Sequence, residues 1–250
     1  MTDPYVKQII ENEVAYIEFY HPIHNSLPGN ILLELVEVIT NAGENDQIKV
    51  IVLKSGGDRT FCAGASFKEL ININDQATGK VFFSGFANVI NAMRTCPKFI
   101  IGRIQGKTVG GGVGLAASTD YCMATKYASI KLSELNIGIG PFVVGPAIER
   151  KIGLSAMSQI AIDAATFYTA SWAKQQGLFT HVFESTAELD LAVKATAEHL
   201  CTYNLNAMKE MKKVFWKGTE DWNTLLAERA EISGRLVLSE VTKEKLKDFK

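Results

Sequence analysis

The sequence predicts an α/β fold followed by a helical C-terminal region. Residues 13–20 alternate apolar and polar side chains as a strand does, and residues 31–43 carry apolar side chains at helical spacing. Residues 49–55 then form a short apolar run that ends in a glycine-containing loop. A strand, a helix and a buried strand in succession are typical of parallel sheets covered by helices.

The same alternation continues through the middle of the chain, where each element ends at a recognisable signal. Pro97, for example, ends a helix whose apolar residues fall on one face. Helices are predicted from residue 66, over 80–95, over the small residues of 105–125, over 146–162 and over 171–176, and strands over 98–104 and 128–135.

The C-terminal part of the chain has an almost wholly helical pattern, with Gly218 and Gly234 as expected breaks. We therefore predict an α/β core over residues 1–185 and a helical region over 186–250. Residues 239–250 form a charged amphipathic segment. A solvated terminal helix and a position at a subunit interface or ligand rim are both open for this segment.

Composition and charge exclude several classes of function. With 26 Lys and Arg against 27 Asp and Glu, the formal net charge of −1 argues against a nucleic-acid-binding protein. The sequence contains no run of 18 apolar residues that would predict a membrane span, and its charged start is unlike a signal peptide. We therefore expect a cytoplasmic protein that does not bind membranes.

Cysteines and histidines give no pattern of a metal site. The four cysteines are widely spaced and mostly have apolar neighbours, so we expect buried free thiols in a reducing compartment. The four histidines form no zinc-binding cluster. We therefore expect no metal and no separate cofactor.

Two segments of small residues are candidates for polarising a carbonyl group. The first, 61–66, follows a predicted strand, and the second, 110–114, lies between a predicted strand and a helix. Amides at a helix N-terminus lack partners and stabilise negative charge, so a pair of such turns can form an oxyanion hole. Close helix packing is the alternative reason for the glycines. Neither a dinucleotide-binding nor a phosphate-binding glycine motif is complete here.

Glu134 is the candidate for proton transfer. It stands between apolar residues at the end of a predicted strand, and a carboxylate in an apolar site has a raised pKa that suits acid–base catalysis near neutral pH. A solvent-facing carboxylate at a strand end or a helix cap is the alternative. For Asp120, which lies among small residues, a structural hydrogen-bonding role is favoured over a catalytic one.

Taken together, four segments resemble the enoyl-CoA hydratase/isomerase (crotonase) family in order and spacing. FCAGASFKEL is similar to the family's F-x-A-G-A-D-x-K-E, and GRIQGKTVGGGVGLAASTD to its N-G-x-x-x-G-G-G-x-E-L-x-x-x-x-D. SELNIGIGP is similar to P-E-x-x-x-G-x-x-P, and AKQQGLF to A-x-x-x-G-L-V. The resemblance implies a spiral of ββα units, a helical C-terminal region that drives formation of a homotrimer or homohexamer, and acyl-CoA substrates of fatty acid metabolism.

By position, the resemblance assigns the oxyanion hole to the amides of Ala65 and Gly111 and the catalytic carboxylate to Glu134. Coenzyme A would arrive as part of the substrate rather than as a cofactor. The residues that would bind substrate and coenzyme A are Ala63, Ala65, Ser66, Phe67, Lys68 and Gly111.

The departures from the family pattern concern catalysis. Gly114 stands where two-glutamate hydratases carry their first glutamate, and residues 142–144, Phe-Val-Val, replace a glycine-rich stretch, which should narrow the acyl site. A single glutamate can serve hydration of a short or branched 2-enoyl-CoA, and Ser133-Glu134 resembles the pair in family hydratases that work with one glutamate. The missing glutamate points instead to isomerisation. Two alternatives are a Δ3,Δ2-enoyl-CoA isomerase and a non-catalytic acyl-CoA-binding protein, and Tyr121 or a C-terminal residue could replace the missing glutamate.

Overall fold

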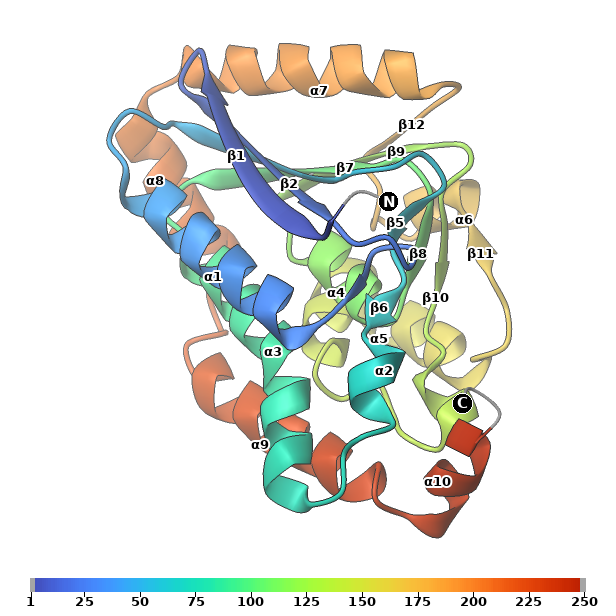
Figure 1. Cartoon of the computed structure of the whole chain (residues 1–250). Coiled ribbons are helices and arrows are strands. Elements are labelled where there is room, and N and C mark those ends of the chain that lie inside the picture. The colour runs from blue at the N-terminus through green and yellow to red at the C-terminus, as the bar shows by residue number, and fades with distance from the viewer. Residues whose placement is uncertain (1–2, 248–250) are drawn as a thin grey trace.

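A six-stranded sheet in the order β1-β2-β4-β7-β9-β12 is the main layer of the computed structural model, which describes residues 3–247 (Figure 1). The β1–β2 pair is antiparallel and the other pairs are parallel. The strands are β1 Tyr5–Glu11, β2 Val14–Tyr20, β4 Val50–Ser55, β7 Phe99–Ile104, β9 Tyr121–Thr125 and β12 His181–Phe183. The last three residues of the predicted 239–250 segment lie outside the described part of the chain.

Both faces of this sheet are buried, which explains the continuous apolar runs of its strands. On β4, Ile51 and Leu53 belong to the main hydrophobic cluster, whereas Val50 and Val52 belong to a second cluster with Leu189. Alternate side chains of one strand therefore serve two cores.

A four-stranded sheet in the order β11-β10-β8-β5 and the short parallel pair β3–β6 lie beside the main sheet. Their strands are β3 Ser26–Leu27, β5 Thr60–Cys62, β6 Gly64–Ala65, β8 Lys107–Val109, β10 Ser129–Lys131 and β11 Tyr168–Thr169. The helices are α1 Gly29–Glu44, α2 Phe67–Leu70, α3 Gln76–Thr95, α4 Gly111–Ala117, α5 Gly145–Ile162, α6 Ala170–Gln175, α7 Thr186–Cys201, α8 Leu205–Phe215, α9 Trp222–Leu236 and α10 Glu240–Lys247, with a 3-10 helix, η1, at Glu134–Ile137.

The predicted α/β alternation is confirmed, and individual elements differ from the prediction. The strand β1 was not predicted, and it pairs with β2 over seven residues. The predicted helix over 105–125 was wrong at both ends, because β8 and β9 flank the shorter α4. Residues in a sheet make hydrogen bonds and side-chain contacts with strands that are distant in sequence, and these contacts override the preference of the local sequence pattern.

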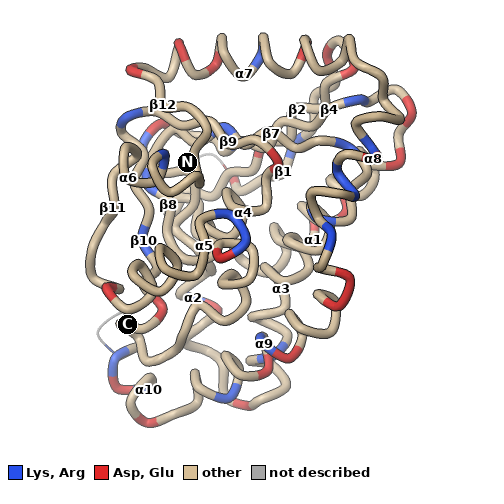
Figure 2. Tube along the Cα trace, turned by 180° about the vertical axis from the view of Figure 1, so that it is seen from behind, with Lys and Arg blue, Asp and Glu red and all other residues tan. Residues whose placement is uncertain are grey.

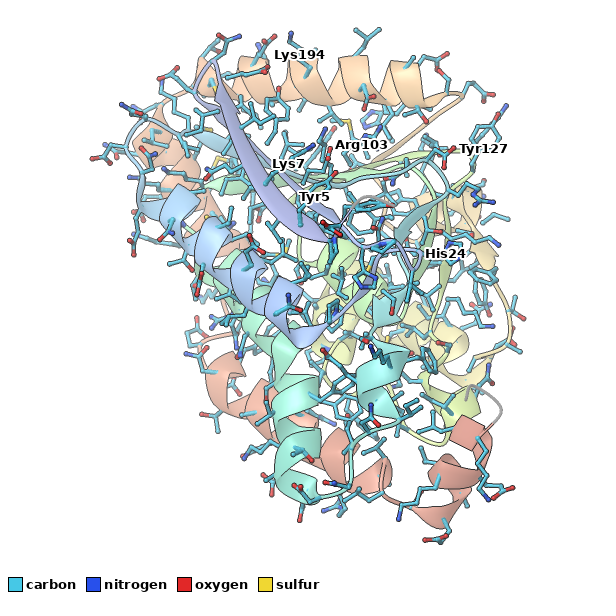
Figure 3. The ribbon with its side chains drawn as sticks, viewed as in Figure 1. Tyr5, Lys7, His24, Arg103, Tyr127 and Lys194 are labelled. Carbon is cyan, nitrogen blue, oxygen red and sulfur yellow. The ribbon has the colours of Figure 1, made fainter. Side chains whose placement is uncertain are left out.

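The helical C-terminal region is present, and α7 packs across the upper face of the main sheet (Figure 1). Arg103 of β7 reaches toward α7, where its Nε lies 2.7 Å from Asp190 Oδ1 (Figure 3). Helix α7 shares its hydrophobic cluster with strands of the α/β part, so packing does not mark a division at residues 185 and 186. That boundary stays a prediction.

Gly218 has a φ of +82° and separates α8 from α9 as predicted, but Gly234 lies inside α9, so its prediction as a break was wrong. Gly234 serves close helix packing instead. A Cβ on it would lie 2.7 Å from Lys80 N and 2.9 Å from the carbonyl carbon of Gly79 on α3. The closely packed α3–α9 pair therefore places α9 beneath the α/β part (Figure 1).

Charged residues of both signs are distributed over the outer helices (Figure 2). This agrees with the nearly balanced composition, a net charge of −1. Between residues 3 and 247, none of the helices combines the length and the apolar character that crossing a bilayer requires. The four cysteines are free and buried, as predicted.

Candidate active site

The two predicted small-residue turns meet in the structure. Gly64 in β6 has a φ of +89°, and a Cβ on it would lie 3.6 Å from Gly111 N and 3.2 Å from Val109 O. Only glycine combines this backbone conformation with so close an approach. Ala65 and Gly111, the two predicted amide donors, are therefore carried by adjoining turns.

The backbone at Ala65 and the position of Gly111 are compatible with an oxyanion hole. Ser66 N donates to Leu27 O at 3.0 Å, so the preceding amide, that of Ala65, points to the other side of the strand, away from β3. Gly111 is the first residue of α4, and its N–H is among the amides that have no acceptor within the helix. Two such donors aimed at one site stabilise a developing negative charge.

Glu134 begins η1 rather than ending a strand, and it lies against the glycine turn. A Cβ on Gly110 would be 2.9 Å from Glu134 Oε1, and Gly110 has a φ of +52°. The Oε2 atom is buried and has no hydrogen-bond partner within residues 3–247. Burial raises the pKa of Glu134 to about 7. The prediction of a carboxylate in an apolar site is confirmed in its geometry, whereas its catalytic role stays a prediction.

A cavity of about 80 Å³ unites these groups. Its wall is apolar except for Glu134, Ser133, Ser233 and the backbone of the two turns. The lining residues are Ala63, Gly64, Ala65, Phe67, Leu70, Phe82, Phe83, Phe86, Gly110, Gly111, Ser133, Glu134, Ile137, Ile139, Gly140, Pro141, Phe142, Val143, Val144 and Ser233.

Two residues predicted to bind coenzyme A lie outside this lining. The Ser66 side chain accepts a hydrogen bond from Glu69 N at 3.3 Å and so caps α2. Lys68 is exposed on α2. Their roles toward the coenzyme remain predictions, as do those of Ala63, Ala65, Phe67 and Gly111.

The phenylalanines of α3 and Ser233 of α9 were not predicted as site residues. Their positions depend on α3 and α9 packing against distant parts of the chain. In the sequence, Phe82 and Phe86 could be recognised only as part of the apolar face of a predicted helix, a pattern that most core helices share.

Asp120 and Tyr121 are kept away from the cavity by other partners. Asp120 accepts hydrogen bonds from Ile100 N at 2.7 Å and Trp216 Nε1 at 3.0 Å, and its Oδ2 lies 2.9 Å from Lys212 Nζ. The favoured structural role of Asp120 is therefore confirmed. The Tyr121 hydroxyl lies 3.2 Å from His181 Nδ1 and does not replace the missing glutamate.

No group of three or more His, Cys, Asp or Glu side chains within residues 3–247 is arranged to hold a metal ion. The ionisable side chain that lines the described cavity is that of Glu134. The site therefore offers hydrogen-bond donors and one carboxylate of raised pKa.

The chain is similar to a known protein family and to several characterised proteins. The family model for enoyl-CoA hydratase/isomerase matches residues 9–248. The peroxisomal Delta(3,5)-Delta(2,4)-dienoyl-CoA isomerase of Arabidopsis thaliana is 27% identical over 231 residues, covering 86% of this chain and 81% of the relative. The mitochondrial methylglutaconyl-CoA hydratase of Mus musculus is 31% identical over 171 residues, 68% of this chain but only about half, 54%, of that protein.

The fold has close counterparts among solved structures. The crystal structure of an enoyl-CoA hydratase from Bacillus halodurans superposes with a TM-score of 0.90 at 22% identity, covering 98% of this chain and 99% of that one. This likeness confirms the predicted crotonase fold with its spiral of ββα units. With its family model matched from residue 9 to residue 248, the chain belongs to the enoyl-CoA hydratase/isomerase family.

Proposed function

We propose that this protein adds water across the double bond of a short or branched 2-enoyl-CoA thioester. The observation that carries the proposal is the buried, unpartnered Oε2 of Glu134 beside the Gly110–Gly111 turn. The amides of Ala65 and Gly111 bind the thioester oxygen, and Glu134 moves the proton. Coenzyme A enters as part of the substrate, and the chemistry requires no other cofactor.

In this mechanism one carboxylate acts twice. The Glu134 carboxylate takes a proton from a water molecule while the water oxygen bonds to C3 of the substrate, and the electrons of the C2–C3 double bond move to the thioester oxygen as an enolate. The two amides stabilise this negative charge. The enolate then collapses, and the protonated Glu134 returns its proton to C2. Water is added as H and OH, and the carboxylate is regenerated.

The pKa of Glu134 supports both halves of this cycle. A group with a pKa of about 7 is both a competent base and a competent acid near neutral pH. Ordinary solvent-exposed glutamates titrate near 4.3 and are weak bases. A carboxylate kept in an apolar wall costs folding free energy, which argues against a purely binding role for this site.

A Δ3,Δ2-enoyl-CoA isomerase is the second candidate, and the space over Gly114 favours it. A Cβ on Gly114 would lie 2.6 Å from Val144 Cγ1, so no second carboxylate fits at that position as the chain is packed. Isomerisation needs one base, which removes a proton from C2 of a 3-enoyl-CoA and returns it to C4. The dienoyl-CoA isomerase relative supports the same chemistry.

We also propose a cytoplasmic homotrimer or homohexamer that serves fatty acid metabolism. The apolar side chains of Met211, Val214 and Phe215 are 48%, 69% and 49% exposed on α8, which supports a protein interface. The buried free thiols support a reducing compartment.

Ultraviolet absorbance of the conjugated enoyl thioester separates the candidates. Purified protein is given crotonyl-CoA and, separately, a 3-enoyl-CoA. We expect loss of conjugation from crotonyl-CoA. Gain of conjugation from the 3-enoyl substrate alone would make the isomerase the correct assignment. Two flat traces, with acyl-CoA binding retained in a calorimeter, would contradict both reactions on these substrates and favour a branched substrate or the non-catalytic role.

A further inference from the structure

Phe82 of α3 lies between two separate cavities. It lines the active-site cavity with Glu134, and it also lines a larger groove of about 650 Å³ between α1, α3 and the segment after α2. Its neighbour Phe83 lines only the first of these. The two rings meet edge to face with centroids 5.0 Å apart.

The larger groove is predominantly apolar. Its wall includes Leu32, Leu33 and Val36 of α1, and Ile73 and Val81 from the other side. Two of its polar side chains are already engaged: Glu69 Oε2 accepts from Gly29 N at 3.0 Å, and Asn72 Nδ2 donates to Lys68 O at 2.7 Å. A groove of this kind fits a hydrocarbon chain better than a polar group.

Helix α3 sets the distance from the reactive end to Phe82. Phe86 marks the reactive end, because a Cβ on Gly111 would lie 2.4 Å from its ring. Phe82 is four residues earlier on the same helix, so it stands about one helical turn, roughly 5.4 Å, farther along the wall. An acyl chain whose carbonyl sits at Gly111 reaches Phe82 after a few carbons.

We infer that Phe82 is a specificity-determining residue that closes the acyl site and separates it from the groove, so that short acyl chains are selected. This inference rests on the proposed acyl-CoA function of the same site. With the Phe82 ring removed, the cavity joins the groove, and a longer straight acyl chain gains a path between α1 and α3. Leu33 and Val81, 60% and 74% exposed, would then border its distal end.

The test compares binding of butyryl-CoA and octanoyl-CoA, two saturated thioesters that undergo no hydration, by titration calorimetry. The proteins are wild type, Phe82→Ala, and Phe83→Ala as the matched control. A buried methylene strengthens binding about fourfold, so four extra methylenes set an upper limit of about 200-fold. We expect wild type and Phe83→Ala to favour butyryl-CoA, and the ratio for Phe82→Ala to shift toward octanoyl-CoA by at least about tenfold.

Phe82→Leu is measured as well, because it retains apolar volume and folds if the alanine variant does not; its ratio should shift in the same direction. An unchanged ratio in folded Phe82 variants or an equal shift in Phe83→Ala would overturn the inference while leaving the proposed function in place. A wild type that already favours octanoyl-CoA would overturn the inference and the short chain length of the proposed substrate, but not the proposed hydration by Glu134. If neither thioester binds to the wild-type protein, the proposed function itself is contradicted.

Discussion

Val144 occupies the space that a side chain at position 114 would need. A Cβ on Gly114 would lie 2.6 Å from Val144 Cγ1 and 2.8 Å from Val144 Cβ. Both residues are buried, so neither can turn toward solvent. The glycine at position 114 and the valine at position 144 are thus parts of one packing arrangement, which leaves no room for a second glutamate beside Glu134.

This packing predicts a coupled pair of substitutions. Gly114→Ala should lower the free energy of unfolding by about 1–3 kcal/mol, because overpacked cores distort to accommodate an added methyl group. Val144→Ala in the same chain should recover part of the loss, since it removes the nearer methyl groups. Chemical denaturation of the two single variants and the double variant gives the coupling. Additive effects of the two substitutions would show that the contact is not tight.

The raised pKa of Glu134 predicts opposite pH trends for activity and stability. Hydration starts from the carboxylate, so kcat/KM should rise with pH and level off above about 7. The folded protein holds a proton that the unfolded chain releases above pH 4.5, so the stability contributed by this group is lost as pH rises from about 4.5 to about 7.

Glu134→Gln carries no such proton. Above pH 7 it should therefore be more stable than wild type by up to about 3 kcal/mol. Denaturant titrations of both proteins at pH 5 and pH 8 measure the difference. A stability gap that is the same at the two pH values would show that the carboxyl group titrates normally.

Gly138 connects the 3-10 helix η1, which carries Glu134, to the C-terminal helix α10. It ends η1 with a φ of +84°, and a Cβ on it would lie 2.5 Å from Thr242 Oγ1 of α10. Gly138→Ala should destabilise the fold by about 1–2 kcal/mol from backbone strain alone and should also lower kcat by displacing Glu134.

Gly218→Ala is the matched control, since Gly218 has a φ of +82° with nothing within 4 Å of an added Cβ. It should show the strain without the loss of kcat. Combining Gly138→Ala with Thr242→Ala should restore part of the activity. If both glycine variants lose kcat alike, the contact with α10 does not position Glu134.

The apolar wall predicts discrimination against charged acyl groups. A second carboxylate on the acyl chain would be buried against phenylalanine, isoleucine and valine side chains, beside the carboxylate of Glu134. Burying an uncompensated charge is strongly unfavourable. We expect kcat/KM for 3-methylglutaconyl-CoA to be at least about 100-fold below that for crotonyl-CoA, since several kcal/mol are involved. Comparable kcat/KM values for the two substrates would show that a cation outside these lining residues pairs with the acyl carboxylate.

The sequence predicted the two glycine turns and the buried carboxylate of the site better than its walls. Glycines at 64 and 110 and the carboxylate at 134 are residue types that a tight turn and a proton transfer require, so local pattern and resemblance were enough to select them as candidates. The positions of Phe82 and Ser233 depend on α3 and α9 packing together, a contact between segments about 150 residues apart. Gly234 illustrates the limit of local pattern, since a glycine that breaks a helix and one that packs two helices look alike in sequence.

The central claim is that the Glu134 carboxylate carries out the proton transfers. The most direct measurement is the rate of loss of crotonyl-CoA conjugation by wild type, Glu134→Gln and Glu37→Gln, a control carboxylate exposed on α1. With butyryl-CoA binding retained in all three, kcat should fall by about 10²–10⁴ in Glu134→Gln and stay at the wild-type value in Glu37→Gln. Hydration by Glu134→Gln at the wild-type rate would contradict the account.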